Sequence, residues 1–299
     1  MARAQRRHTE AVKRAEQRST RVMWAGMLVG GVIAVGIVLA PDFRKPAEET
    51  VAPVEIRTSN SQAVTPTVKI EALRTRVLNR YPHDTNAFTQ GLIWHDGVLY
   101  ESTGQYGKSS LRRVRLDDGK VLVERKLDPK LFGEGLARVD ERLVALTWRS
   151  GQAIVFDLET LEKQETLRYD GEGWGLCFDG TSLIMSDGSS TLTFRDPETM
   201  KVRSQLTVRE DGIPVRMLNE LECVGPHIYA NLWRRHEIVR IDPSTGNVTA
   251  SIDAKGLLSR EEAARADVLN GTAYKPDTKT FLLTGKLWPA VFEVEFIPR

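Results

Sequence analysis

Cysteine is almost absent from this chain, since its 299 residues contain only Cys177 and Cys223. Two cysteines are too few for a disulfide framework, and their spacing matches no zinc-ligand pattern. They occupy matching places in two neighbouring repeats, which are described below. We therefore predict two buried thiols on adjacent strands, in preference to a bond between them, although an oxidising compartment would permit that bond.

Several catalytic signatures are also missing. The sequence has no phosphate-binding glycine loop and no dinucleotide fingerprint. No Ser-His-Asp triad is evident, because the histidines near turns have no nucleophile motif around them: His83, His95, His227 and His236. The formal net charge is only +2, so no nucleic-acid partner is expected.

The positive charge is concentrated at the N-terminus. Residues 1–21 carry seven Arg or Lys against two Glu, and residues 22–40 then run for 19 positions without a charge. Roughly 20 apolar residues suffice for a membrane-spanning helix, and the basic flank indicates a cytoplasmic N-terminus. We predict a cytoplasmic segment (1–21), a transmembrane anchor (22–40) and a Pro-rich flexible linker (41–67). The alternative is a cleaved signal peptide ending near Ala40 and a secreted protein.

From residue 68 onward, short apolar stretches alternate with turn residues, and only residues 259–266 suggest a helical insert. The Asp96-Gly97 pair between two apolar stretches is a hairpin signal, because both residues tolerate the positive φ of tight turns. Aspartates in four related turns, Asp117, Asp157, Asp196 and Asp242, are separated by 40, 39 and 46 residues. This spacing is typical of four-stranded propeller blades of about 40–50 residues.

The repeats predict an all-β, five-bladed β-propeller over residues 68–299. The last unit, residues 269–296, has room for only about three strands. An extended stretch within residues 67–80 is expected to supply the fourth, so that the N-terminal strand closes the last blade and removes exposed sheet edges.

Unusual polar and aromatic residues recur at equivalent places in these units. Some start the first strand of a unit, namely Gln90, Glu134, Trp174, Asn219 with Glu220, and Asn270; others end the second strand, namely Trp148, Asp187, Trp233 and Lys286. In a blade, the start of strand one and the end of strand two share one mouth of the channel. We expect these side chains to ring a single funnel, the usual form of a small-molecule site.

The ordered motifs of these units resemble the glutaminyl cyclases of the plant-latex and bacterial type. The resemblance covers residues 81–296 and includes Phe88-Thr89-Gln90-Gly91-Leu92, Gly133-Glu134-Gly135, Glu172-Gly173-Trp174-Gly175-Leu176, Leu218-Asn219-Glu220-Leu221-Glu222, Asn231-Leu232-Trp233, Leu269-Asn270-Gly271 and Thr284-Gly285-Lys286-Leu287-Trp288. It implies a glutaminyl-peptide cyclotransferase that converts N-terminal glutamine to pyroglutamate and releases ammonia. The family's catalytic glutamate falls on Glu134, and its other site positions fall on Gln90, Trp174, Asn219, Trp233 and Lys286.

Under this hypothesis Glu134, Asn219 and Lys286 take part in catalysis, while Gln90, Trp174, Trp233 and Trp148 bind substrate. One carboxylate suffices to move the protons, so no cofactor is required; the sequence leaves open a structural divalent ion on the axis. The partners would be peptides and proteins with N-terminal glutamine. We expect a monomer whose catalytic domain lies outside the cytoplasm, on the periplasmic side of a bacterial inner membrane.

Two other functions fit the same fold. In a metal-dependent lactonase or esterase, oxygen atoms on inner strands would hold a calcium ion, and the candidate ligands are Glu134, Asn219, Glu220, Glu222 and Asn270. In a non-enzymatic binding propeller, the mouth would only hold a partner, since fold does not imply function.

Overall fold

A computed structural model describes residues 69–299. The predicted cytoplasmic segment, transmembrane anchor and linker lie outside these residues. Within residues 69–299, no helix has the length and apolar character needed to cross a membrane. The described part contains 22 strands and one helix of four residues. The prediction of an all-β domain is therefore confirmed.

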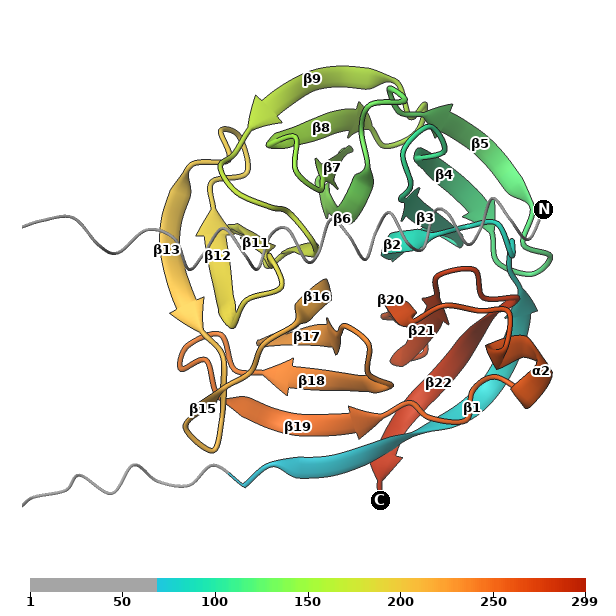
Figure 1. The fold of residues 1–299 in the computed structure, drawn as a ribbon, viewed down its shortest axis with the longest axis vertical. Coiled ribbons are helices and arrows are strands. Elements are labelled where there is room, and N and C mark those ends of the chain that lie inside the picture. Colours follow the sequence, from blue (N-terminus) through green and yellow to red (C-terminus); the bar gives the residue numbers. More distant parts are fainter. Residues whose placement is uncertain (1–68) are drawn as a thin grey trace, which may run out of the picture. The chain divides into compact units, whose positions relative to one another are not determined.

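Most strands belong to groups of four that are consecutive in sequence and antiparallel to their neighbours (Figure 1). The first three groups are separate sheets: β2 (Thr89–His95), β3 (Val98–Thr103), β4 (Ser110–Arg115) and β5 (Val121–Lys126); β6 (Gly133–Val139), β7 (Arg142–Thr147), β8 (Gln152–Asp157) and β9 (Lys163–Arg168); β10 (Leu176–Phe178), β11 (Leu183–Met185), β12 (Thr191–Arg195) and β13 (Val202–Thr207).

The remaining long strands form one eight-stranded sheet, which consists of two groups of four. The fourth group is β16 (Leu218–Val224), β17 (His227–Leu232), β18 (Glu237–Ile241) and β19 (Val248–Asp253), and the fifth is β20 (Leu269–Lys275), β21 (Thr280–Gly285), β22 (Ala290–Pro298) and β1 (Glu71–Pro82). A small hairpin of β14 (Arg209–Glu210) and β15 (Ile213–Pro214) precedes the fourth group. Helix α2 (Arg260–Ala263) lies within the predicted helical insert and begins with a capping box of Ser259 and Glu262.

Strand β1 joins the two ends of the described chain. It pairs antiparallel with β22 from Leu73 opposite Pro298 to Pro82 opposite Ala290, as the sequence predicts. Its first residues also pair parallel with β19, which links the fifth group to the fourth. The backbone edge of β22 is thus covered by an early segment of the chain, and an exposed edge that would invite association is avoided.

The first strand of each group contacts the first strand of the next, in the order β2, β6, β10, β16, β20 and back to β2. Glycines make this close approach feasible. A Cβ atom added to Gly175 would lie 1.9 Å from the carbonyl oxygen of Asn219, and one added to Gly135 would lie 2.6 Å from the carbonyl oxygen of Trp174. The repeated Gly-Leu pairs are therefore required because neighbouring backbones meet there.

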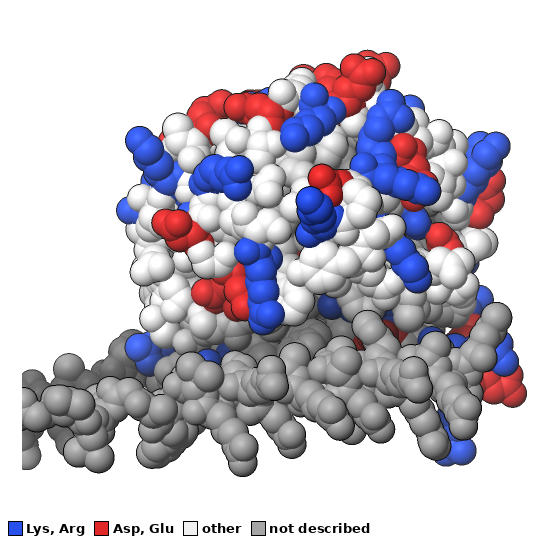
Figure 2. Space-filling model, turned by 45° about the horizontal axis from the view of Figure 1, so that its top comes forward, with Lys and Arg blue, Asp and Glu red and all other residues white. Residues whose placement is uncertain are grey.

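Apolar side chains fill the space between neighbouring groups. Leu92 and Leu99 of the first group pack with Ala273, Leu282 and Val291 of the fifth, so the core is continuous across the junction of the chain ends. Turns between strands follow the predicted chemistry, because Asp96 and Gly97 both have positive φ, at 46° and 80°. Basic and acidic side chains of the described residues are interspersed over the face shown in Figure 2.

The prediction of two free thiols is wrong. Cys177 on β10 and Cys223 on β16 form a disulfide bond, with Cα atoms 5.5 Å apart. These strands are adjacent first strands of the third and fourth groups, and the two positions are equivalent within their repeats. Their Cα separation is within the range that a disulfide needs. The sequence placed both residues correctly but did not show how near the two strands lie.

Candidate functional site

The predicted site residues lie at one end of the strand groups. Gln90, Glu134 and Asn219 are near the starts of β2, β6 and β16, and Trp174 lies two residues before the start of β10. Trp148, Trp233 and Lys286 immediately follow β7, β17 and β21. Because the first and second strands of each group are antiparallel, the start of the first strand and the end of the second lie at the same end of the group. We call the surface formed by these seven residues the mouth.

Glu134 and Lys286 are the two ionisable residues of the mouth, only 5% and 6% exposed. Burial raises the pKa of Glu134 well above its ordinary value; the Lys286 ammonium opposes this rise, and the negative charge of Glu172 adds to it. Burial lowers the pKa of Lys286, although Glu134 and Asp267 partly offset the effect. The pair therefore holds a carboxyl and an amine whose pKa values have moved toward each other, as in sites that transfer protons.

Lys286 also contacts an aromatic ring that the sequence analysis left out of the site. Its Nζ atom lies 4.8 Å from the ring centroid of Phe88, within cation–π range. Phe88 in turn packs edge-to-face on Phe132, whose ring lies 5.6 Å from that of Trp148. A continuous aromatic wall thus runs from Lys286 to the second group of strands.

A second aromatic pair continues this wall over the third and fourth groups. The rings of Trp174 and Trp233 lie 5.5 Å apart in an edge-to-face arrangement. Both indoles, like that of Trp148, are only partly buried, so part of each ring remains available to a ligand. Such walls exclude water and strengthen electrostatic interactions within a site.

Glu172 links the two parts of the aromatic wall. Its Oε2 atom accepts hydrogen bonds from Trp148 Nε1 at 2.8 Å and from Trp174 Nε1 at 3.2 Å, while its Oε1 accepts from Arg149 Nε at 2.8 Å. Burial alone would raise the pKa of Glu172, but these three donors lower it, so the carboxylate is charged. The Glu172 side chain therefore fixes the orientation of both indoles. The sequence predicted Trp148 and Trp174 as site residues but did not show that they share this partner.

Gln90 is 3% exposed, and its Oε1 atom accepts a hydrogen bond from Asn270 Nδ2 at 3.2 Å. The same Asn270 nitrogen donates to the carbonyl oxygen of Thr89 at 3.0 Å, so Asn270 serves to join the fifth group to the first. Asn219 is 2% exposed at the start of β16. Asp187, in contrast, is exposed, and its carboxylate caps the backbone N–H of Ser189. We therefore leave Asp187 out of the mouth.

The carboxylates proposed above as calcium ligands make other contacts. Glu220 accepts backbone hydrogen bonds from Thr272 at 2.9 Å and Leu92 at 3.4 Å, and Glu222 accepts one from Tyr274 at 2.7 Å. Burial raises the pKa of Glu222 to about 8 and that of Glu220 well above its ordinary value. Within residues 69–299, no group of three or more His, Cys, Asp and Glu side chains is arranged to hold a metal ion. Glu220 and Glu222 therefore link neighbouring first strands, and their arrangement does not suit a calcium-binding site.

Three residues of this surface were missed by sequence reasoning: Glu172, Phe88 and Phe132. Glu172 stands two positions before Trp174 in the Glu172–Leu176 motif, and Phe88 stands two positions before Gln90. Their proximity in sequence to predicted site residues was the available signal. Glu172 contacts Trp148 and Phe88 contacts Lys286, and spacing alone does not show such contacts between residues well separated in sequence.

Several known proteins resemble this chain in sequence or in fold. The family model described as glutamine cyclotransferase matches residues 50–296. A glutaminyl-peptide cyclotransferase of Arabidopsis thaliana is 42% identical over 225 residues, which cover 73% of this chain and 70% of that protein. The crystal structure of Myxococcus xanthus glutaminyl cyclase matches with a TM-score of 0.71 and 38% identity, over 77% of this chain and all of that one. The chain belongs to the glutamine cyclotransferase family.

Proposed function

We propose that this protein is a glutaminyl-peptide cyclotransferase, which converts the N-terminal glutamine of peptides and proteins to pyroglutamate and releases ammonia. The observation that carries the proposal is the buried Glu134–Lys286 pair within the tryptophan-lined mouth of a chain of this family. The alternative of a calcium-dependent hydrolase is not favoured, because Glu220 and Glu222 hold backbone N–H groups.

We further propose that the five groups of strands are the blades of a five-bladed β-propeller. The ring of contacts between their first strands and the closing position of β1 support this architecture. It would explain why residues from every repeat reach the mouth. The fixed ring would also hold the reacting groups without a conformational change, so that little ordering is needed when substrate binds.

The proposed reaction is an intramolecular acyl transfer. The α-amine nitrogen of the glutamine attacks its own side-chain amide carbon, forming the new C–N bond and a tetrahedral intermediate. Glu134 accepts a proton from the attacking amine and passes it to the amide nitrogen, which then leaves as ammonia when its C–N bond breaks. A carboxyl with a raised pKa suits both steps, because it gains and loses a proton near the working pH.

The other mouth residues would orient the substrate and stabilise charge. The Lys286 ammonium would stabilise the oxyanion that develops on the amide oxygen. Trp174, Trp233 and Trp148 would pack on the glutamine methylenes and exclude water. Gln90 and Asn219 would hydrogen-bond the substrate amides, for which both donor and acceptor atoms are present in their side chains. Well-oriented attack of this kind can remove roughly 7–11 kcal/mol of the barrier.

Ammonia release from a glutamine-initiated dipeptide tests the function. We expect release in the presence and absence of a chelator, because the proposed proton transfers involve only side chains. Lactone hydrolysis should be assayed beside it. If the protein released no ammonia but hydrolysed a lactone, and a chelator abolished that hydrolysis, it would instead be a metal-dependent hydrolase. If it turned over neither substrate, the binding propeller would be favoured.

We also propose that residues 22–40 anchor a monomeric enzyme whose propeller faces the periplasm. The basic flank of residues 1–21 and the uncharged run that follows support this orientation. Exported proteins with N-terminal glutamine would then be its substrates. Protease accessibility of the propeller in intact spheroplasts measures the orientation directly.

Replacing Glu172 by glutamine is expected to lower kcat/KM by about tenfold, mainly through a higher KM. Hydrogen bonds to a charged group contribute about 1.5–3 kcal/mol, and their weakening would loosen both indoles. The charge of Glu172 also raises the pKa of Glu134. The acidic limb of the pH–rate profile should therefore move to lower pH, which a merely structural role for Glu172 would not cause.

The matched control for this variant is Glu165→Gln, since Glu165 is a half-exposed carboxylate on the outer strand β9. Steady-state kinetics across pH should leave the control like the wild type. An unchanged KM and an unchanged acidic limb in Glu172→Gln would show that the carboxylate does not position the tryptophans.

A further inference from the structure

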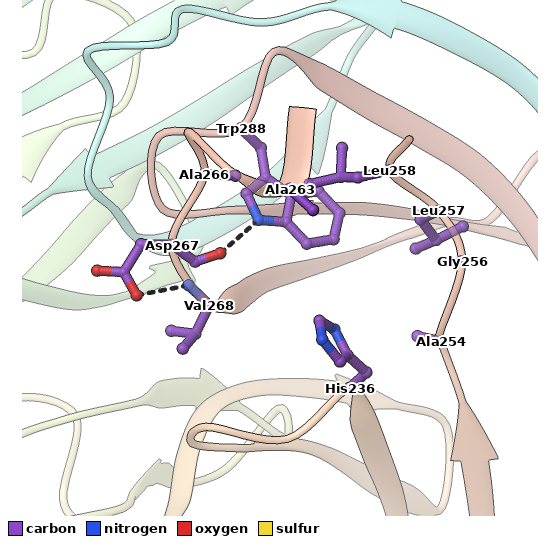
Figure 3. A pocket seen from close by; sticks show the side chains of 10 residues that line it. All are labelled: His236, Ala254, Gly256, Leu257, Leu258, Ala263, Ala266, Asp267, Val268 and Trp288. Atoms are coloured by element: carbon purple, nitrogen blue, oxygen red, sulfur yellow. Dashed lines mark hydrogen bonds between the residues drawn. The ribbon is translucent and has the colours of Figure 1, made fainter. Parts of the chain in front are cut away.

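A cavity lies at the same end of the strand groups as the mouth, between the fourth and fifth groups. Its volume is about 340 Å³, and its walls come from the turn after β17, the segment around α2 and the turn after β21. Figure 3 shows the side chains that line it, which include His236, Leu257, Leu258, Ala263, Val268 and Trp288. We call it the side pocket.

The side pocket and the mouth share a wall. Lys286 exchanges backbone hydrogen bonds with the segment that lines the pocket: Asp267 N donates to the Lys286 carbonyl oxygen at 2.8 Å, and Lys286 N donates to the Val268 carbonyl oxygen at 3.0 Å. Trp288 of the pocket follows Lys286 by two residues, and His236 follows Trp233 by three. The pocket therefore adjoins the part of the mouth that Trp233 and Lys286 form.

The lining of the side pocket suits an apolar group. Leu257, Leu258 and Val268 are only partly buried, and Trp288 forms a fully buried wall. Two N–H groups on this wall already have partners, as the dashed lines in Figure 3 show: Trp288 Nε1 donates to the Asp267 carbonyl oxygen at 2.9 Å, and Val268 N donates to Asp267 Oδ1 at 2.7 Å. The volume lies at the small end of the range of ligand pockets, about 300–1,000 Å³, and so fits one large side chain.

The positions of the reacting groups determine which part of a substrate can enter the side pocket. Both reacting groups, the α-amine and the side-chain amide, belong to the first residue and must meet at Glu134. The remainder of the peptide extends from the carbonyl of that residue and has to leave through the mouth. Each extended residue spans at most about 3.3–3.6 Å. Because the pocket shares the Lys286 wall with the mouth, the residues that directly follow the glutamine are the ones placed to enter it.

Resting on the proposed cyclase function, we infer that the side pocket is a specificity subsite for an apolar side chain in the two residues that follow the N-terminal glutamine. An aliphatic or aromatic side chain there would displace water from Leu257, Leu258 and Val268. The enzyme would then select among glutamine-initiated chains by their following sequence, and not by the glutamine alone.

The test compares peptides that start with glutamine and carry glycine, leucine or phenylalanine at the second position, and then at the third. We expect kcat/KM to be about tenfold higher for leucine or phenylalanine than for glycine at one of these positions, the lower end of the effect of filling an apolar pocket. Equal kcat/KM values at both positions would overturn the subsite while leaving the cyclase function intact. No ammonia from any peptide would overturn the function itself.

Two neighbouring alanines provide a matched pair of variants. Ala263 lines the side pocket, whereas Ala264, the next residue, is exposed and is not part of its lining. Ala263→Trp should fill the pocket and reduce the preference for leucine over glycine to less than twofold, and Ala264→Trp should keep it. Both residues are exposed, so folding is retained. A preference that survives Ala263→Trp unchanged would refute the assignment.

Discussion

Replacing Glu134 by glutamine should lower kcat on glutamine-initiated peptides by about 10²–10⁴-fold, the usual contribution of a general acid–base group. The substitution preserves the shape of the side chain and removes its ability to accept a proton at working pH. Folding should be retained, because burial already disfavours the charged carboxylate. Initial rates of ammonia release, with circular dichroism as the check on folding, measure both effects.

The pKa shifts of Glu134 and Lys286 also predict how the activity of the wild-type enzyme depends on pH. The base must be deprotonated to accept a proton, and the pKa of Glu134 lies well above 4.5, so activity should rise with pH through a limb well above that value. The pKa of Lys286 is lowered by burial, so loss of its proton should bring activity down again below the ordinary lysine pKa of 10.5. A bell-shaped profile of kcat/KM is therefore expected.

Glu222→Gln is the matched control for Glu134→Gln. Glu222 is a partly buried carboxyl that is also on a first strand, and its pKa is raised to about 8, but its side chain accepts a hydrogen bond from Tyr274 N. A glutamine oxygen can accept the same bond, so kcat should be unchanged. If the Glu134 variant retained wild-type turnover, or if both variants lost it equally, Glu134 would not be the proton-transfer group.

Loss of the Cys177–Cys223 disulfide should lower the free energy of unfolding by about 4 kcal/mol. The bond closes a loop of 46 residues, and the chain-entropy model gives about 4 kcal/mol for a loop of this size. The disulfide also holds β10 against β16, the strands that follow Trp174 and carry Asn219. Its loss should therefore loosen two adjacent sectors of the mouth as well as the fold.

The measurement is chemical denaturation of the oxidised wild type, the reduced wild type and the Cys177→Ala/Cys223→Ala double variant. Reduced wild type and double variant should share a lower midpoint. A further sample, the double variant treated with reductant, controls for effects of the reagent and should not change again. Identical midpoints for oxidised and reduced wild type would mean that the bond does not contribute to stability in solution.

Local signals predicted the elements of this fold well. Asp96-Gly97 requires positive φ at both residues and gives the expected hairpin. Glycines such as Gly175 recur because neighbouring strands approach too closely for a Cβ atom. The closing strand was predictable because the last repeat lacked one strand, and β1 supplies it.

Contacts between repeats could not be predicted in the same way. Glu134 and Glu220 occupy almost equivalent places in their repeats, yet Glu134 lies at the mouth beside Lys286, whereas Glu220 holds backbone N–H groups of Leu92 and Thr272. Nothing in the two local motifs separates these roles. The difference depends on which donors the neighbouring strands present.

The amino-acid sequence by itself determined the all-β character, the strand repeats, and which strand ends carry the residues of the mouth, because turn chemistry and spacing act over a few neighbouring positions. Only the tertiary structure decided the Cys177–Cys223 bond, the shared hydrogen bonding of Trp148 and Trp174 to Glu172, and the side pocket beside Lys286. Each of these depends on the distance between segments that are far apart in the chain, which is set by how the packed strand groups fit together.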